Sequence, residues 1–160
     1  MRTNLTIPAQ TDSGAVLEEN MIGALWHICF VANSFVFPIY AQYDKKYKIS
    51  RMEFVILYVL SHRDNLMAWE ICRMTGLPKN NISRGVNKLE TRKLITRTPD
   101  PADARRALLT ITAQGKALFD ELIVSYVDRA ETCLSPLDKK DRKDLERIMT
   151  KLALATPSVA

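Results

Sequence analysis

Residues 71–112 constrain the fold more than any other part of the chain, because three patterns follow one another there in a fixed order. A short helical segment comes first, and a basic helical segment follows Leu77 and Pro78. Two β-rich runs come last, at residues 94–98 and 107–111, separated by a loop with two prolines and two arginines. This order predicts a small helical unit that ends in a β-hairpin.

Positive charge is concentrated in the same region. From Lys79 to Arg106 there are eight Lys or Arg side chains and three Asp or Glu side chains, which gives a net charge of +5. The whole chain also carries +5, so the remainder sums to zero. Such asymmetry is typical of a surface that neutralises phosphates. An ordinary solvated basic face is the alternative, and charge alone does not separate the two.

The basic helical segment has two different sides. At 100° per residue, Ile82, Val86 and Leu89 fall on one side, which predicts that this side packs inward. The opposite side suits the edges of DNA bases, since Arg pairs with guanine, Asn with adenine and Ser with either. The residues on that side are Asn80, Ser83, Arg84 and Asn87.

Three more residues of this segment suit the phosphate backbone. Lys79 and Asn81 lie in its first turn, and Lys88 lies farther along. Gly85 lowers helix propensity by about 1 kcal/mol relative to Ala, and Asn and Ser lower it as well. We therefore expect this face to serve contacts rather than helix stability.

The β-rich runs predict a hairpin whose long loop, residues 99–106, is stiffened by its prolines. Asp103 lies two residues before Arg105 and can hold its guanidinium in a fixed pose. A guanidinium held on a rigid finger suits a narrow minor groove, where the negative potential is enhanced. The alternative is a plain surface hairpin with an exposed ion pair worth less than about 1 kcal/mol. The hairpin residues expected at DNA are Arg97, Asp103, Arg105 and Arg106.

These elements predict a mainly α chain with a small β wing, that is, a winged helix-turn-helix with an added helical dimerisation lobe. In order and spacing, the motifs closely resemble the MarR family of transcriptional regulators. The motifs are Glu70-Ile71-Cys72, Met74-Thr75-Gly76-Leu77, Ile82-Ser83-Arg84, Asn87-Lys88-Leu89-Glu90, Leu94-Ile95-Thr96-Arg97, Asp100-Pro101-Ala102-Asp103-Ala104-Arg105 and Leu109-Thr110-Ile111-Thr112-Ala113-Gln114-Gly115.

The resemblance implies a homodimer that binds a pseudo-palindromic operator in double-stranded DNA and usually represses. It implies that Ser83 and Arg84 read the major groove and that Arg105, oriented by Asp103, enters the minor groove. One position departs from the family, because Lys93 stands where a glycine usually follows the recognition helix. Glycine there permits a left-handed helix end, so Lys93 either accepts that conformation or the helix ends differently.

The rest of the chain divides around this region. We expect a flexible tail at residues 1–14, a dimerisation helix at 15–48, the winged helix-turn-helix at 49–111 and C-terminal dimerisation helices at 112–160. A chain of 160 residues that is 47% hydrophobic can bury a sizeable core. The first 14 residues are polar and lack the pattern of a signal peptide, so we expect a cytoplasmic protein.

The segment from Asn20 to Tyr43 carries no charged side chain, and residues 21–39 approach the length of a membrane span. Several polar residues interrupt it, which argues against a membrane as partner. A helix that is apolar on most sides can instead be buried in a larger interface. We expect Pro38 to kink this helix or split it near Phe37.

The C-terminal third predicts two more helices. Thr112 is a candidate N-cap for the first, and Ser135-Pro136-Leu137-Asp138 resembles a capping box with proline at the first helical position of the second. Pairing with a second copy would bury their apolar stripes and set two recognition helices about one DNA turn apart. Packing within one chain is the alternative. The stripes are Leu118, Phe119, Leu122, Ile123, Tyr126 and Val127, then Leu145, Ile148, Met149 and Leu152.

The first helix and its exit are rich in aromatic side chains, most of which we expect in the core. The resemblance implies that small phenolic or aromatic carboxylates bind in a cleft between the dimerisation and DNA-binding lobes, where an apolar pocket with a few polar groups suits them. Trp26, His27 and Phe30 are the candidate residues for this effector. No cofactor is expected.

Two other functions stay open. Oxidation sensing would act through Cys29, although no cationic neighbour in the sequence helps its thiol to ionise. A protein-interaction module without DNA binding is the other, but its helix would usually carry Leu, Phe or Trp anchors. Three cysteines at unrelated spacings and two histidines argue against a disulfide framework or a metal site. The sequence has no nucleophile and base in a catalytic pattern, so we do not expect an enzyme.

Overall fold

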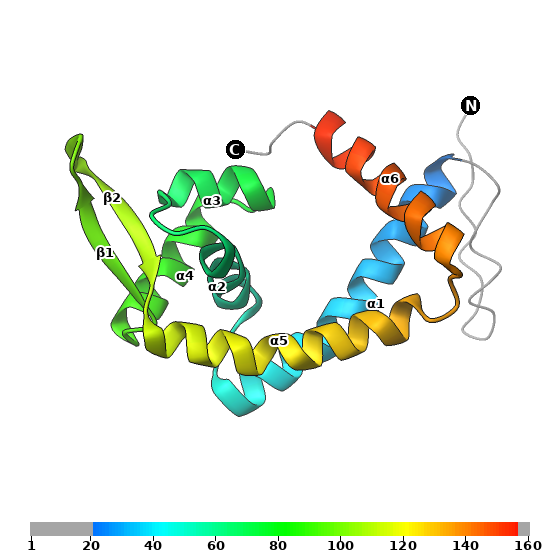
Figure 1. Ribbon diagram of the computed structural model, residues 1–160, viewed down its shortest axis with the longest axis horizontal. Coiled ribbons are helices and arrows are strands. Elements are labelled where there is room, and N and C mark those ends of the chain that lie inside the picture. The colour runs from blue at the N-terminus through cyan, green and yellow to red at the C-terminus, as the bar shows by residue number, and fades with distance from the viewer. Residues whose placement is uncertain (1–20, 157–160) are drawn as a thin grey trace, which may run out of the picture. The chain divides into compact units, whose positions relative to one another are not determined.

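A computed structural model describes residues 21–156 (Figure 1). The chain divides into two compact units, residues 1–38 and residues 39–160, and each is treated by itself. The predicted tail at residues 1–14 lies outside the described residues. The second unit contains the winged helix-turn-helix, which confirms the predicted fold class.

The helix α1 spans Met21–Tyr47 without a break and contains Pro38. The prediction that Pro38 splits this helix is wrong, because proline removes a single backbone donor and the remaining intrahelical bonds carry the helix past it. Residues Gly23–Tyr47 are long enough and apolar enough to cross a membrane, with a mean hydropathy of 1.5 and little burial. Most side chains of α1 before Pro38 are exposed.

Three helices form the helix-turn-helix region: α2 at Arg51–His62, α3 at Ala68–Thr75 and α4 at Lys79–Thr91. Helix α2 begins at a capping box in which Ser50 and Glu53 bond each other's backbone amides. Its buried side chains form the centre of the core, and α3 and α4 both contact it. Short α3 therefore leads directly into the second helix of the motif (Figure 1).

The inward side of α4 is the predicted one, since Ile82, Val86 and Leu89 are buried. Gly85 is buried with them, and a β-carbon built there would come within 2.6 Å of the Ile56 Cδ1 atom of α2. The glycine thus allows α4 and α2 to approach closely. This packing requirement, rather than the needs of the opposite face, explains why a poor helix former stands at this position.

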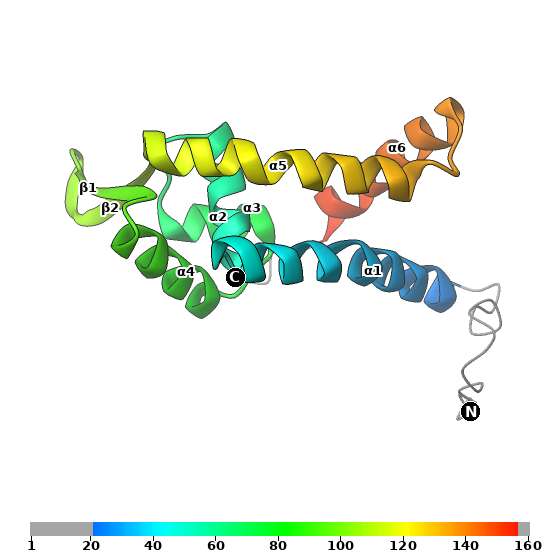
Figure 2. The same cartoon turned by 90° about the horizontal axis from the view of Figure 1, so that it is seen from below.

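The wing consists of β1 at Ile95–Asp100 and β2 at Asp103–Ile111, paired antiparallel (Figure 2). The predicted eight-residue loop is wrong, because the strands continue to a two-residue turn closed by the Ala102 N–H, which donates to Asp100 Oδ1 at 2.9 Å. Pro99 is tolerated within β1, since a strand of a two-stranded ribbon has one unpaired edge. Arg105 and Arg106 therefore lie in a strand and not in a loop.

Helix α5 spans Ala113–Leu134, and its predicted N-cap is confirmed, because Thr112 Oγ1 accepts the Gly115 N–H at 3.0 Å. Helix α6 spans Lys139–Ala155 and begins three residues later than predicted. Asp138, not Ser135, is its N-cap, and it accepts the amides of the next turn. The N–H of Ser135 still bonds the carbonyl of Thr132, so this residue belongs to the end of α5.

Aromatic side chains join the last turns of α1 to α2 and α5. Tyr43 is fully buried, and its hydroxyl donates to the Leu122 carbonyl of α5 at 2.6 Å. Its ring lies 5.2 Å from that of Phe54, which in turn lies 6.2 Å from Phe119. The second unit therefore has one core, to which α1, α2, α4 and α5 contribute.

Candidate nucleic-acid interface

The outward side of α4 carries the four residues expected at base edges. Asn80, Ser83, Arg84 and Asn87 are all exposed. They share one side because the buried residues of the helix hold the other side against α2 and α3. The Arg84 side chain lies along the helix, with its Nε donating to the Asn80 carbonyl at 3.4 Å. This is a polar helix face open to an approaching groove.

The beginning of α4 suits a phosphate. Pro78 is the N-cap and supplies no side-chain hydrogen bond, and the first turn contains no acidic residue. The unpaired amides and the positive end of the helix dipole attract anions at such a terminus. Lys79 is exposed there and Asn81 is partly exposed. Lys88 lies near the other end of α4, in a separate hollow with Asp44, Glu53 and Arg92 among its lining residues.

Arg97 joins the wing to α4. Its Nη2 donates to Asn87 Oδ1 at 3.0 Å and lies 3.2 Å from Glu90 Oε2. All three side chains are at least partly exposed. The ion pair reduces the free charge of Arg97, while the hydrogen bond fixes which way the Asn87 amide faces. Arg97 therefore orients a predicted base-reading residue in addition to carrying charge of its own.

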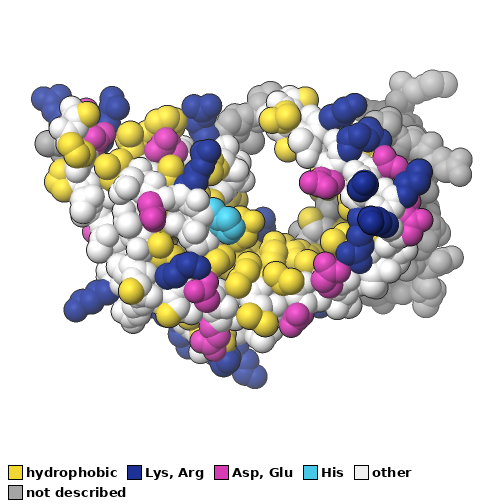
Figure 3. Space-filling view, in the orientation of Figure 1, with side chains coloured by type: hydrophobic (Ala, Val, Ile, Leu, Met, Phe, Trp, Pro, Cys, Tyr) yellow, Lys and Arg dark blue, Asp and Glu magenta, His cyan; other side chains and the backbone are white. Residues whose placement is uncertain are grey.

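At the wing tip the structure corrects one expected contact. Asp103 Oδ2 pairs with Arg106 Nε at 3.1 Å, and its other oxygen accepts the backbone N–H of Arg105 at 3.1 Å. Asp103 thus holds the guanidinium of Arg106 and not that of Arg105. Regular strand alternation would put Arg105 on the side of Asp103. The pairing with Arg106 arises at the irregular end of the hairpin, where the Asp103 carboxylate turns back onto the Arg105 amide. Figure 3 shows Lys and Arg side chains gathered at this tip.

A groove of about 680 Å³ lies between the start of α3, the outer side of α4 and the base of the wing. It brings together five of the eleven predicted DNA-binding residues, which are Lys79, Ser83, Asn87, Arg97 and Arg106. Arg84 and Arg105 are exposed but do not line it. The groove therefore combines cations from α4 and from both strands with the polar side of the helix.

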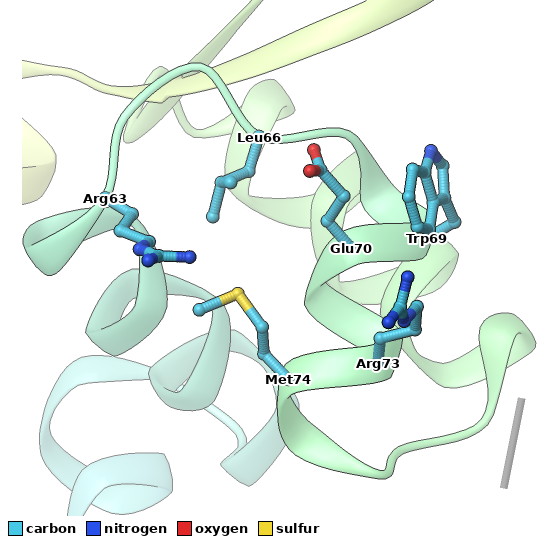
Figure 4. A pocket seen from close by; sticks show the side chains of 6 residues that line it. All are labelled: Arg63, Leu66, Trp69, Glu70, Arg73 and Met74. Atoms are coloured by element: carbon cyan, nitrogen blue, oxygen red, sulfur yellow. The ribbon is translucent and has the colours of Figure 1, made fainter. Parts of the chain in front are cut away.

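Sequence reasoning missed Trp69 of α3, whose side chain is 49% exposed and lines this groove. The same residue borders a second hollow, of about 310 Å³, between α3 and the end of α2 (Figure 4). Arg73 lies over its ring at 5.7 Å, a cation–π contact, and Arg63 and Met74 face the hollow from other sides. Ile71 follows two residues later in the same helix, and residues two apart face different sides. An inward Ile71 could therefore have predicted that Trp69 faces outward.

The three candidate effector residues lie on α1. Trp26 and Phe30 are 61% and 57% exposed, and His27 is half-buried. Trp26 and Phe30 line a hollow of about 460 Å³ along one side of the helix, together with Cys29 and Phe37. His27 does not line it. The structure therefore brings two of the three candidates together and adds the exposed Cys29 to them.

A second aromatic group, in the other unit, was not predicted as a site. Tyr40 lies beneath the Arg51 guanidinium, 5.9 Å from ring centre to cation, and burial raises the pKa of its hydroxyl to about 12. Burial also raises the pKa of Tyr126. The rings of Tyr58 and His62 lie beside them with their centres 4.6 Å apart, and both side chains are exposed. No spacing rule relates residues from α1, α2 and α5, so the sequence carried no signal for this cluster.

The described residues also bear on metal binding and on thiol chemistry. Within residues 21–156, no group of three His, Cys, Asp or Glu side chains is arranged to hold a metal ion. Cys72 is buried, as expected for the first helix of the motif, and burial raises the pKa of its thiol.

Lys93 adopts the left-handed conformation with φ of 58°, so helix α4 ends as in the family although glycine is absent.

Comparisons with known proteins agree with this arrangement. The model of the MarR family matches residues 47–106. The transcriptional repressor NicR of Pseudomonas putida is 25% identical over 105 residues, which are 66% of this chain and slightly less than two thirds of NicR. The transcriptional regulator MhqR of Bacillus subtilis is 23% identical over 109 residues, 68% of this chain and 75% of MhqR.

Solved structures give the same result. A MarR/EmrR family transcriptional regulator from Acinetobacter sp. ADP1 has a TM-score of 0.72 and 26% identity, with 81% of this chain and 91% of that chain covered. BpsR of Bordetella bronchiseptica, whose DNA binding is regulated by 6-hydroxynicotinic acid, has a TM-score of 0.71 and 22% identity, with 84% and 99% covered. Residues 47–106 of the chain thus match the MarR family model, and the relatives and structural neighbours of the chain are transcriptional regulators of that winged helix-turn-helix type.

Proposed function

We propose that the chain is a transcriptional repressor that binds a pseudo-palindromic operator as a homodimer and leaves it when a small aromatic carboxylate binds. The observation that carries the DNA-binding part is the groove in which Lys79, Ser83, Asn87, Arg97 and Arg106 meet. In this account the outer side of α4 reads the major groove. The wing carries Arg105 toward the adjacent minor groove, and Arg106 stays in place through Asp103.

The DNA-binding part is tested by equilibrium titration at several salt concentrations. The probe is a duplex that the wild-type chain selects from a random pool. Arg105→Ala and Arg84→Ala should both lower affinity, and only Arg84→Ala should also relax base preference, at a cost of about 1–3 kcal/mol for its base contact. Arg73→Ala, on α3 and outside the groove lining, is the control. If both test variants bind like wild type, the assigned surface is wrong.

Apolar side chains that the single chain leaves exposed support a homodimer. On α5 they include Val124 and Val127, and Figure 3 shows apolar side chains running along this helix. None of the residues described in α6 is buried. Trp26 and Phe30 are exposed on α1. A second copy is the partner that fits, because its own stripes are equally apolar and would close the interface symmetrically. The large apolar residues exposed on α6 are Leu145, Ile148, Met149, Leu152 and Leu154.

Sedimentation of the purified chain tests the dimer. We expect a dimer in wild type and a shift toward monomer in Leu152→Glu, because the new carboxylate would have to be buried. Lys151→Glu changes the neighbouring residue on α6 and is the control. A monomeric wild type, or a chain that enters the aqueous phase only with detergent, would contradict the proposal and turn attention to the membrane-length α1.

The proposed effector is a small aromatic carboxylate, and its class has support of its own. It is supported by BpsR, whose DNA binding is regulated by 6-hydroxynicotinic acid, and by the aromatic hollow that Trp26 and Phe30 line. A ligand weakens operator binding only by its different affinity for the binding-competent and incompetent dimers. We therefore expect 6-hydroxynicotinic acid or benzoate to raise the melting temperature with concentration and to release the selected duplex.

Trp26→Ala should weaken this response without changing duplex affinity in the absence of ligand. The same assay separates the rival function, oxidation sensing, which the exposure of Cys29 favours over a role for buried Cys72. Release by hydroperoxide but by neither acid, abolished in Cys29→Ser, would replace the ligand with a redox signal. A chain that binds no duplex at all would instead favour a protein-interaction module.

A further inference from the structure

Arg92, the residue that follows α4, fastens the end of that helix to the end of α1. Its Nη1 donates to the Lys48 carbonyl at 2.8 Å and its Nη2 donates to the Tyr47 carbonyl at 3.0 Å. One guanidinium thus bonds two successive carbonyls that lie 45 and 44 positions earlier in the chain. All of these residues belong to the same compact unit.

The two carbonyls are natural acceptors for a cation. The last carbonyls of a helix lack intrahelical donors and form the negative end of its dipole. Helix α1 ends at Tyr47, and Lys48 adopts the left-handed conformation with φ of 54°, which turns the chain sharply toward α2. Arg92 therefore caps α1 from outside the helix, at the point where the chain reverses.

Arg92 also faces a buried carboxylate. Glu53 of α2 is only 2% exposed, and its Oε2 accepts the N–H and the hydroxyl of Ser50. Its other oxygen lies 3.8 Å from Arg92 Nη1. Burying a carboxylate is costly unless hydrogen bonds and an opposite charge satisfy it. The same guanidinium therefore contacts both the end of α1 and the start of α2.

The next two residues join α4 to α5. Thr112 Oγ1 donates to the Lys93 carbonyl at 2.8 Å, and the Thr112 N–H donates to the Leu94 carbonyl at 3.0 Å. Within three residues after the recognition helix, the chain is bonded to α1, α2 and α5. The end of α4 is thus the point at which the direction of the helix is set.

We propose that Arg92 is a positioning residue, which fixes the direction of α4 against α1 and α2 and does not itself contact DNA. The inference rests on the proposed function, because direction matters only if the outer side of α4 enters a groove. Arg84 lies eight residues before Arg92, about 12 Å along the axis. Tilting the helix at its fastened end would displace the base-reading side chains without removing any phosphate-binding cation.

Lysine cannot replace this contact. An ammonium group keeps the charge beside Glu53, but it is a point charge on a flexible stem and does not present two parallel N–H donors to neighbouring carbonyls. Arg92→Lys therefore removes the geometry and keeps the charge. Arg73→Lys is the matched control, since Arg73 is also exposed but lies on α3, against Trp69.

The test compares two probes: a duplex selected by the wild-type chain from a random pool, and poly(dI-dC). Arg92→Lys should lower affinity for the selected duplex about tenfold or more, the effect of a lost charge-assisted hydrogen bond. Affinity for poly(dI-dC) and the dependence of log affinity on log salt should not change. Arg73→Lys should match wild type with both probes.

Two results would overturn the inference while leaving DNA binding intact. One is an Arg92→Lys variant that binds the selected duplex as wild type does. The other is an equal loss with both probes in Arg92→Ala, with the salt slope reduced by about one, which marks a phosphate contact.

Amide hydrogen exchange tests the fastening without DNA. Arg92→Lys should speed exchange at residues 47–50 and 88–92 and leave the rest of the unit unchanged, because the bonds it loses lie at those helix ends. Unchanged exchange at these residues would refute the inference even if no duplex is selected. A failure of wild type to select a duplex, with faster exchange in the variant, would instead refute the proposed function.

Discussion

Gly115→Ala should destabilise the protein at the place where α5 begins. A β-carbon built on Gly115 collides with the Leu94 carbonyl group, a backbone atom pair, and comes within 3.0 Å of Ile111 Cγ1. The Leu94 carbonyl cannot move aside freely, because it accepts the N–H of Thr112 at 3.0 Å. Relief therefore requires α5 to shift as a whole against the wing.

The size of the effect follows from two opposing terms. Alanine is favoured over glycine in a helix by about 1 kcal/mol. Overpacking a well-packed site costs about 1–3 kcal/mol, and a clash with tethered backbone belongs at the upper end of that range. The expected net loss is about 2 kcal/mol of unfolding free energy, which lowers the melting temperature by about 4–8 °C in a chain of this size.

Gly85→Ala is the matched comparison, since its β-carbon would meet the far end of one side chain, Ile56, and no backbone atom as closely. It should cost clearly less than Gly115→Ala, because a terminal methyl group can shift. Urea unfolding of the two variants and wild type, followed by circular dichroism, measures the difference. A Gly115→Ala variant as stable as wild type would refute this reading of the close approach.

Three further predictions concern single contacts. Tyr43→Phe keeps the ring but removes the buried hydroxyl bond to Leu122, so unfolding free energy should fall by about 1–2 kcal/mol in thermal melts; no loss would mean that the bond contributes nothing. Hydrogen bonds from a tyrosine hydroxyl and then from a lysine, both on α1, lower the pKa of Glu121. The stability that the ionised Glu121 side chain contributes is therefore present above about pH 4.3 and is lost as pH falls through the lowered pKa. Glu121→Gln should therefore flatten the acid side of the stability curve, and an unchanged slope would contradict that assignment. Asp103→Ala frees the Arg106 guanidinium, and should weaken duplex binding while leaving the melting temperature within about 1 °C, because exposed ion pairs contribute little to stability; tighter binding would show that Asp103 only opposes DNA.

Helical periodicity predicted the two sides of α4 correctly because the pattern is local and strong. Ile82 and Val86 had to face inward, and this alone placed Ser83 and Arg84 outward. Thr112 was recognised as an N-cap for the same reason, since a cap is decided by a few adjacent residues.

Local signals failed where two of them competed. Ser135 and Asp138 are both good N-caps, and the residue that is not already bonded to the end of α5 became the cap. Prolines near the wing tip predicted a long loop, but the strand pairing continues past Pro99 to Asp103. Strand alternation favoured Arg105 as the partner of Asp103, but the Asp103 carboxylate bonds the Arg105 backbone amide and pairs with the Arg106 guanidinium.

Contacts between distant residues could not be predicted. The bond from Arg92 to Lys48 joins residues 44 positions apart, and nothing in either segment marks the other. The same holds for Gly85. A larger residue at this position would collide with the side chain of Ile56, which belongs to another helix. Packing decides such positions, and packing depends on the assembled fold.

The central claim, that two copies of one surface dock onto duplex grooves, is tested most directly by hydroxyl-radical and methylation footprinting on a duplex selected by the wild-type chain. We expect two protected major-groove stretches whose centres lie about 10–10.5 base pairs apart or a multiple of that, with minor-groove protection beside each. Arg105→Ala should remove only the minor-groove protection. A single protected stretch, or none at low salt, would contradict the account.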